Sequence, residues 1–390
     1  IALLELRLLA SHTYLLTSVL HRCSRNHMRQ CWLFLLLLCT TPAFIVFMFK
    51  SNDILSSVWM GDYQVVMNCS TLLETTNPPF QALLIDTHIL QNLGEIMCKQ
   101  RQKVRLAVNV ELLKSVRKKD YKEYDIVYYQ NFSDRDYLRV YDHDTTRIIP
   151  KIPLNINGNL SIPGNVTMFL EAWKRSKFID CLGLNMRRQS AGKPYLPVEK
   201  SVQVMSSLMR YLITFDVYPF LFCGSMLGWY RECNIIPHTM DIDFAAPIEE
   251  YTPELLEDLA SGGKFFLHRK FGLPNDSFEF TIKPKDKNRP TVDLFWVYTT
   301  SNESWVGGTS GDGTKYKYTY PLLNETCACD LLGHIFWVPC NPREVLEAEY
   351  GPKWYLDHPT KSFSWSSSQH NVKKNGKWPP SLMTEVYEIF

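Results

Sequence analysis

The chain has 390 residues, of which 45% are hydrophobic, 21% charged and 13% aromatic. This composition is typical of globular proteins with one large or two modest domains. The net charge is only +2 and the two signs are well mixed along the chain, which predicts no broad basic face for nucleic acid and favours a small or neutral partner.

The N-terminal region contains a predicted membrane anchor. Residues 31–49 are 19 consecutive positions without a charge, and a helix of that length spans roughly 28 Å, close to the hydrocarbon thickness of a bilayer. Three arginines precede it: Arg22, Arg25 and Arg29. This excess of positive charge predicts a cytosolic tail at 1–30 and a type II orientation. A cleaved signal peptide is the alternative, but the apolar run is long and no clear small-residue cleavage site follows.

The segments on either side of the anchor complete this interpretation. Residue 1 is Ile, whereas Met28 begins a conventional anchor leader. Residues 1–27 are therefore interpreted as upstream or mispredicted sequence, and the orientation is the same with or without them. A polar stem is predicted at 50–77.

Two kinds of residue predict that the body after the anchor is lumenal. Seven N-x-S/T sequons all follow the apolar segment, at Asn68, Asn131, Asn159, Asn165, Asn275, Asn302 and Asn324. Eight of the eleven cysteines also follow it: Cys69, Cys98, Cys181, Cys223, Cys233, Cys327, Cys329 and Cys340. An even number is compatible with up to four disulfides in an oxidising compartment, with the connectivity left open.

Residues 78–194 are predicted to form an accessory α/β domain without concentrated catalytic chemistry. Segments rich in β-branched and aromatic residues predict strands at 82–90, 104–110 and 124–129. The segment 111–119 is predicted to be helical, and short strands continue to residue 167. Four acidic residues are interpreted as solvated turn residues: Asp134, Asp136, Asp142 and Asp144.

Residues 195–390 are predicted to form an α/β (α+β) domain built on a mixed sheet. Apolar residues at helical spacing predict a helix at 198–216, and Thr252 before Pro253 predicts a capped helix at 252–260. A second helix is expected to begin near residue 226. Apolar runs predict strands at 217–222, 239–247, 278–284 and 291–299.

Three carboxylates on two of these strands form a candidate metal site. Asp241 and Asp243 are two residues apart, so they share one face of a strand. Paired carboxylates repel each other unless a cation joins them, and hard oxygen ligands suit Mg²⁺ or Mn²⁺. Asp293 opens another strand and is expected beside the pair in a common sheet. Such a cluster is typical of two-metal phosphoryl transfer.

The residues around the carboxylates indicate which class of fold carries them. Gly224 and Ser225 lie between a buried strand and a helix start, where free N–H groups bind phosphate oxygens. The acidic pair follows 17 residues after Gly224, and Asp293 follows 50 residues after Asp243. This order is characteristic of the DNA polymerase beta-like nucleotidyltransferase superfamily.

A closer resemblance rests on ordered blocks over 195–390. The segment FCGSMLGWYRECNIIPHTMDIDF resembles the signature of the LicD/fukutin family, and HRKFG, DSFEF, VDLFWVY, WVGGTS, KYKYTYP, YGPKW and EVYEIF follow in the family's order. The resemblance is looser over 78–194.

This resemblance implies a Golgi membrane enzyme, with the endoplasmic reticulum as the alternative. It would transfer an alditol phosphate, such as ribitol 5-phosphate, from a CDP-linked donor to a glycan hydroxyl in protein O-linked glycosylation of the O-mannosyl type. A complex with other Golgi glycan transferases is also implied. Asp241, Asp243 and Asp293 match the family's metal carboxylates, and Gly224 and Ser225 match its glycine-serine turn. Departures near the site, at Met226, His238 and Ala245-Ala246, leave the donor open.

Two further donor-binding residues are predicted from their chemistry. Arg231 is a candidate for bidentate pairing with a donor phosphate. Lys317, with Lys315, lies in a glycine-rich segment that is expected to close over the nucleotide.

Three other functions are alternatives. A phosphocholine transferase would use CDP-choline on the same carboxylates, and a Golgi glycosyltransferase would bind a UDP-sugar through its D-x-D pair. A non-catalytic Golgi scaffold would use neither.

Overall fold

The computed structural model describes residues 65–67, 76–93, 98–100, 103–188, 194–286 and 290–390. Val66–Phe390 form one unit, to which this description applies. The predicted tail (1–30), anchor (31–49) and most of the predicted stem lie outside the described residues. Within the described ranges, no helix is long and apolar enough to cross a membrane.

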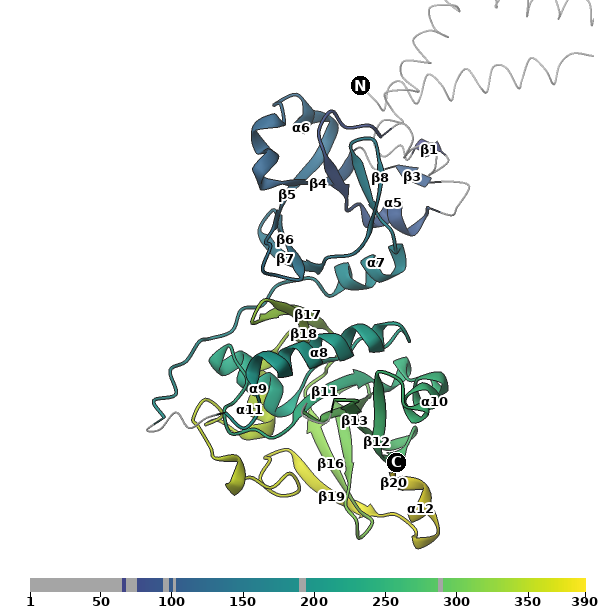
Figure 1. Cartoon of the computed structure of the whole chain (residues 1–390), viewed down its shortest axis with the longest axis vertical. Coiled ribbons are helices and arrows are strands. Elements are labelled where there is room, and N and C mark those ends of the chain that lie inside the picture. The colour runs from purple at the N-terminus through teal and green to yellow at the C-terminus, as the bar shows by residue number, and fades with distance from the viewer. Residues whose placement is uncertain (1–64, 68–75, 94–97, 101–102, 189–193, 287–289) are drawn as a thin grey trace, which may run out of the picture. The chain divides into compact units, whose positions relative to one another are not determined.

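The first half of the unit is organised around a mixed seven-stranded sheet (Figure 1). Its strand order is β7-β6-β5-β4-β2-β9-β8, with parallel pairs only at β4–β5 and β2–β9. The strands are β2 (Ala82–Leu84), β4 (Val104–Asn109), β5 (Tyr124–Asn131), β6 (Tyr137–Asp142), β7 (Thr145–Pro150), β8 (Leu154–Asn157) and β9 (Leu160–Pro163). The helices of this half are α5 (Thr87–Gln91), α6 (Asp120–Glu123) and α7 (Val166–Lys174), and β1 (Val65–Met67) pairs with β3 (Cys98–Gln100).

Three predictions in this half are changed by the structure. The strand predicted over 82–90 ends at Leu84, because Asp86 caps α5 by accepting a hydrogen bond from the Ile89 N–H at 3.2 Å. The segment 111–119 is mostly a short 3₁₀ helix (Val110–Ser115). Asp142 is buried rather than solvated and pairs with Arg105 and Arg147.

The second half is built on a mixed nine-stranded sheet, as the predicted fold class requires. Seven strands run in the order β19-β16-β15-β14-β13-β12-β20. In addition, β11 pairs in parallel with β14, and β10 pairs antiparallel with β11. The strands are β10 (Phe220–Leu221), β11 (Ile242–Pro247), β12 (Phe265–Leu273), β13 (Asp276–Pro284), β14 (Val292–Thr299), β15 (Ser304–Thr309), β16 (Thr314–Tyr320), β19 (Val372–Lys377) and β20 (Tyr387–Ile389). A separate hairpin comprises β17 (Thr326–Leu331) and β18 (His334–Pro339).

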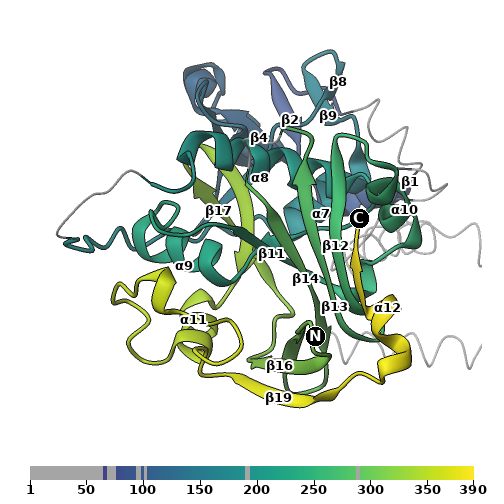
Figure 2. The same cartoon turned by 60° about the horizontal axis from the view of Figure 1, so that its bottom comes forward.

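Helices cover this sheet where the sequence places apolar stripes. They are α8 (Val198–Ile213), α9 (Cys223–Glu232), α10 (Pro253–Ser261), α11 (Pro342–Tyr350) and α12 (Met383–Val386). The predicted cap of α10 is confirmed, since Thr252 Oγ1 accepts from the Leu255 N–H. Figure 2 shows α9 and α11 side by side. Of the two, α9 packs on β11, whereas α11 contacts α9, β16 and β18.

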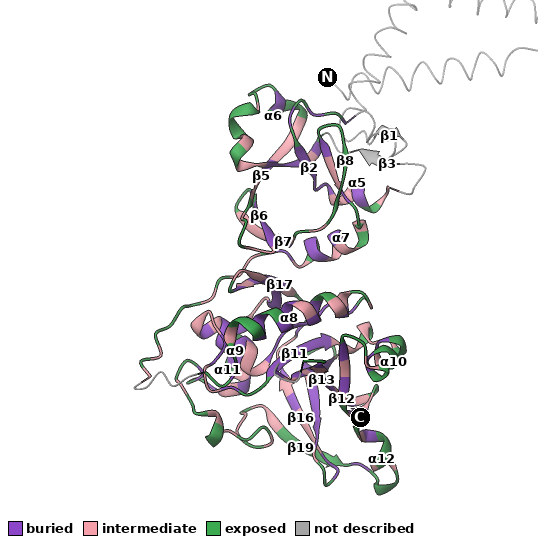
Figure 3. Cartoon of the chain, in the orientation of Figure 1, coloured by how far each residue is buried: buried purple, intermediate pink, exposed green. Residues whose placement is uncertain are grey.

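Two hydrophobic clusters form the core, and the central strands are largely buried (Figure 3). The larger cluster lies mainly in the second half but also includes Tyr137, Ile148 and Ala172 of the first. Two disulfides join described cysteines, Cys181–Cys233 and Cys327–Cys340, while Cys223 and Cys329 are free thiols. The side chains of Cys69 and Cys98 are outside the described residues. The domain boundary predicted at residue 194 stays a prediction.

Candidate metal centre

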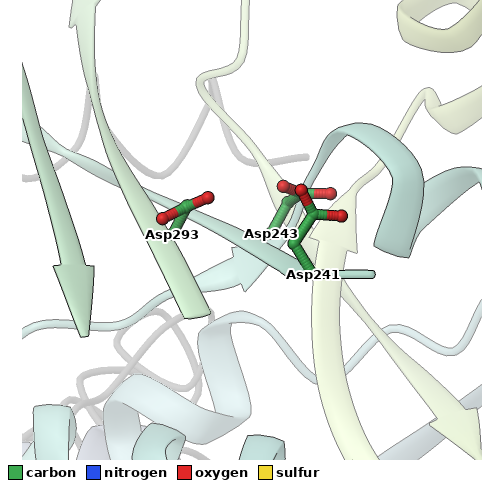
Figure 4. Close-up of side chains that lie close together, drawn as sticks. All are labelled: Asp241, Asp243 and Asp293. Atoms are coloured by element: carbon green, nitrogen blue, oxygen red, sulfur yellow. The ribbon is translucent and has the colours of Figure 1, made fainter. Parts of the chain in front are cut away.

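Three aspartates from two distant segments of the chain meet at one edge of β11 and β14. The parallel register places Asp243 directly opposite Asp293, and Asp241 immediately precedes β11. One carboxylate oxygen from each residue lies within 4.8 Å of the others. Figure 4 shows the three side chains projecting to the same side of the two strands. The predicted juxtaposition of Asp293 with the D-x-D pair is confirmed.

The glycine-serine turn is joined directly to the central carboxylate. The Ser225 N–H donates to Asp243 Oδ2 at 3.4 Å, and the Asp243 N–H donates to Ser225 Oγ at 2.9 Å. A Cβ at Gly224 would lie 3.2 Å from Asp243 Oδ2. Gly224 thus permits the close approach between the first turn of α9 and the acidic cluster.

Neighbouring threonines fix the two outer carboxylates. Thr239 Oγ1 donates to Asp241 Oδ1 at 3.0 Å, and Thr281 Oγ1 donates to Asp293 Oδ1 at 2.7 Å. Thr281 lies opposite Asp293 on β13. Each carboxylate therefore keeps a second oxygen for another ligand.

Burial and mutual repulsion perturb these acids. Burial, followed by the charges of Asp241, Asp293 and Glu349, raises the pKa of Asp243 well above its ordinary range. Burial raises the pKa of Asp293 to about 6, against the hydrogen bond from Thr281. Burial also raises the pKa of Glu349 to about 7. A cluster whose ionised form is this unfavourable fits a divalent cation.

We expect affinity for Mn²⁺ to fall as the pH falls through about 6, because a proton then competes for Asp293. The metal-free protein should show the opposite trend. A carboxyl whose pKa is raised above its unfolded value of about 3.9 stabilises the fold when protonated, and this stability is lost as pH rises through about 6. Calorimetric titration with Mn²⁺ and thermal unfolding in chelator, each from pH 5 to 8, measure the two effects. Metal affinity that is flat over this range would contradict the assignment.

The acidic cluster opens into a cleft of about 910 Å³, at the upper end of the range for small-molecule sites. The chain after α11 contributes many of its lining residues, including Lys353, Trp365 and His370. Arg269, on β12 of the nine-stranded sheet, also lines the cleft. The cleft therefore combines the three clustered aspartates, and three further acidic residues (Glu279, Glu349 and Asp357), with basic groups suited to a charged ligand.

The two predicted donor-binding cations form ion pairs within the protein. Arg231 lines the cleft, but it is only 1% exposed, and its guanidinium donates to Glu232 at 2.9 Å and to the Leu356 carbonyl at 2.9 Å. Lys317 lies between Tyr318 and Tyr316 on β16, so it faces away from the cleft that Tyr318 lines. Its Nζ pairs with Glu303 at 2.8 Å. Lys315, on the same face, pairs with Asp276.

Other residues of the site were missed by the sequence interpretation. Glu349 is fully buried, lines the cleft and accepts a hydrogen bond from the Tyr320 hydroxyl at 3.2 Å. The sequence did contain a sign of this residue. Glu349 follows Val345 by four residues, so helical spacing places this acid on the apolar face of α11. Arg269, Thr281 and Lys353 gave no signal, because their place in the site depends on strand pairing and on an irregular segment.

Comparison with known proteins follows the same two halves. A family model described as W02B3.4-like, N-terminal domain matches residues 68–180. The model described as LicD/FKTN/FKRP, nucleotidyltransferase domain matches residues 217–341 and includes all three aspartates.

Individual relatives extend the similarity over most of the chain. The Caenorhabditis elegans protein W02B3.4 is 40% identical over 331 residues, covering 83% of this chain and 85% of the relative. The same organism's T07A5.1 is 35% identical over 336 residues, covering 83% and 87%. Human ribitol-5-phosphate transferase FKTN is 32% identical over 239 residues, covering 59% of this chain and 50% of that protein. The chain belongs to the LicD/FKTN/FKRP family.

Proposed function

We propose that this protein is a metal-dependent phosphotransferase that moves an alditol phosphate from a CDP-linked donor to a glycan hydroxyl in O-linked glycosylation. The observation that carries the proposal is the meeting of Asp241, Asp243 and Asp293 beside the Gly224-Ser225 turn, in a cleft large enough for a nucleotide. The name of the FKTN relatives, ribitol-5-phosphate transferase, supports an alditol phosphate as the transferred group.

The three carboxylates fit Mg²⁺ or Mn²⁺. Their oxygens converge within 4.8 Å, and no described basic side chain forms an ion pair with them under 4.0 Å. A bound divalent ion would neutralise the carboxylates and stabilise negative charge that develops on the transferred phosphate. Asp241, Asp243 and Asp293 would hold it, while Thr239 and Thr281 orient the two outer ligands.

The chain's own groups also position the donor. The first turn of α9 begins at the acidic cluster, where helix N–H groups lack intrahelical partners and attract phosphate. Arg269 and Lys353 replace Arg231 and Lys317 as the proposed partners of the donor diphosphate, since both line the cleft and are exposed. The acceptor hydroxyl would approach through the open side of the same cleft.

We also propose a Golgi membrane location with the body in the lumen. The uncharged segment 31–49 supports the anchor. Six of the seven sequon asparagines lie in the described residues, and all six are exposed: Asn131, Asn159, Asn165, Asn275, Asn302 and Asn324. Exposure is what glycosylation in the lumen requires.

Replacing Lys353 with Ala should raise KM for the donor about tenfold or more, because a hydrogen bond to a charged group contributes roughly 1.5–3 kcal/mol. Lys317→Ala is the matched control, since it removes the same charge from the face of β16 that points away from the cleft. It should change KM for the donor less than about twofold. Steady-state kinetics at saturating Mn²⁺ measures both. Equal effects of the two substitutions would contradict the assignment of Lys353.

The proposed reaction is tested with purified full-length protein, Mn²⁺ and an O-mannosyl glycopeptide acceptor. CDP-ribitol, CDP-glycerol, CDP-choline and a set of UDP-sugars are supplied separately, and the acceptor mass is followed. We expect a gain of one alditol phosphate from a CDP-alditol. A gain of phosphocholine would identify CDP-choline as the donor, and a gain of a sugar from UDP-sugar would replace the proposal with a glycosyltransferase. Inactivity with every donor would favour a scaffold.

A further inference from the structure

Trp365 presents accessible aromatic surface inside the metal cleft. Tryptophan is highly buried on average in proteins, but Trp365 is 48% exposed although it lines the cleft. By contrast, Trp354 also lines the cleft and is only 7% exposed. An exposed apolar ring within a cleft is surface that a ligand can bury, and the burial of apolar surface favours binding.

Contacts with two neighbouring strands fix the position of the Trp365 ring. The ring of Tyr316 on β16 packs against it with the centroids 5.1 Å apart and the planes at 72°. The Tyr318 hydroxyl donates to the Trp365 carbonyl at 2.8 Å. A Cβ at Gly308 of β15 would lie 3.1 Å from Trp365 Cζ3, so glycine allows the ring to lie against this strand. A ring that is already in place loses little conformational freedom when a ligand binds.

Strand β16 connects Trp365 with the acidic cluster. Tyr320 lies at the end of β16 near this cluster, because its hydroxyl donates to Glu349 at 3.2 Å. Burial, and then neighbouring charges that include Glu349, raise the pKa of Asp243, so Glu349 lies close to the metal carboxylates. Tyr316, which contacts Trp365, is four residues before Tyr320 on the same face of the strand.

Four residues of a strand span roughly 13 Å. This length is similar to that of an extended nucleoside diphosphate between its phosphates and its base. Trp365 and the three aspartates line the same cleft. A nucleotide whose diphosphate lies at the metal centre can therefore place its base at Trp365.

We propose that Trp365 stacks on the cytosine of the CDP-linked donor. This inference rests on the proposed function and assigns the residue that binds the base. The aspartates, with Arg269 and Lys353, bind the phosphate end of the donor, and Trp365 holds the other end. Every nucleobase offers a flat π face to an aromatic ring, so stacking adds affinity without distinguishing one base from another. Trp365 thus positions the donor along the cleft and leaves the choice of base to other groups.

Calorimetric titration of the full-length protein with CDP and Mg²⁺, without an acceptor, tests this assignment. Trp365→Ala should weaken CDP binding at least about fivefold, the lower end of the effect of removing one stacking ring. Trp365→Phe keeps an aromatic face and should retain most of the affinity. Inorganic pyrophosphate has no base, so it should bind to Trp365→Ala and to the parent equally.

Tyr355→Ala is the matched control for Trp365→Ala. Tyr355 belongs to the same irregular segment after α11 and is 47% exposed, but it is not among the residues that line the cleft. This substitution should leave the Kd for CDP within about twofold of the parent.

Tryptophan fluorescence gives a second readout, which a purely structural role of Trp365 would not produce. A base stacked on an indole ring quenches its emission, so CDP with Mg²⁺ should quench the parent and Tyr355→Ala. Trp365→Phe should bind CDP with most of this quenching lost.

Three results would overturn the assignment. They are CDP binding by Trp365→Ala as tight as by the parent, an equal loss of pyrophosphate and CDP binding in this variant, and a parent that does not bind CDP. The first is also the result expected if the ring packs on an acceptor sugar. Because no acceptor is present, a parent that shows the expected binding but transfers nothing would contradict the proposed function alone.

Discussion

Asp243→Asn is expected to reduce transfer by at least about a hundredfold while leaving the metal-free protein as stable as the parent or more stable. Asp243 is the central carboxylate, since it contacts the Gly224-Ser225 turn and lies opposite Asp293. Loss of groups that merely orient metal ligands typically costs 10–100-fold, so loss of a ligand should cost at least as much. CMP release and thermal unfolding in chelator measure the two effects.

The stability half of this prediction separates a metal ligand from a structural residue. In the metal-free protein Asp243 is only 8% exposed and is repelled by its acidic neighbours. A neutral amide of the same shape relieves that repulsion and still accepts from the Ser225 N–H. Asp134→Asn, at an exposed position, is the matched control and should change neither quantity. Full transfer by Asp243→Asn would refute a catalytic role for this carboxylate.

Gly307→Ala is expected to lower the free energy of unfolding by about 3 kcal/mol, at the upper end of overpacking effects. A Cβ at Gly307 of β15 would lie 2.1 Å from Ser277 Oγ and 2.4 Å from Ser277 Cα. Ser277 is fully buried and has a left-handed backbone with φ of 53°, so it has little room to move. Urea unfolding measures the loss.

Gly311→Ala is the matched control for this substitution. It lies beyond the same strand, its φ is not positive, and a Cβ there would meet no atom within 4 Å. Its unfolding free energy should stay within about 0.5 kcal/mol of the parent. If Gly307→Ala were equally harmless, the close packing of β15 on β13 would be wrong. Because Gly308 and Thr309 of β15 line the metal cleft, that result would also place the cleft in doubt.

The acidic cluster was predictable because it depends on short-range rules. Residues two apart on a strand share a face, which placed Asp241 with Asp243. Asp293 began another apolar strand and was expected beside the pair in a common sheet. Its register directly opposite Asp243 was not predicted, because it depends on the long-range parallel pairing of β11 with β14. The turn at Gly224-Ser225 was likewise visible as a break between an apolar strand and a helix.

The basic residues were less predictable, because the charge of a residue does not determine the direction in which its side chain points. Lys317 was selected for its charge, although the alternation along β16 assigns it to the face opposite Tyr318 and Tyr320. The Arg231 guanidinium is engaged in an ion-pair network with Glu232 and Asp357. Asp357 comes from an irregular segment with no periodic pattern, so neither this network nor the place of nearby Lys353 could be predicted.

A similar local competition explains the errors in the first half. The apolar segment 82–90 has strand composition, but Asp86 supplies a helix cap in its middle and divides it. Asp136 looked like a solvated turn residue, yet it accepts from the Ile335 N–H at 2.8 Å and pairs with His334. Both partners lie almost 200 residues away in sequence, beyond the reach of any local pattern.

The central claim is that Asp241, Asp243 and Asp293 together bind the catalytic divalent ion. The most direct measurement is an anomalous difference map at the manganese edge, from crystals grown with Mn²⁺ and CDP. The account predicts a peak in contact with an oxygen of each aspartate, at about 2.0–2.3 Å, with the CDP phosphates on its open side. A well-ordered CDP without a manganese peak between these carboxylates, or a peak at another group of residues, would contradict it.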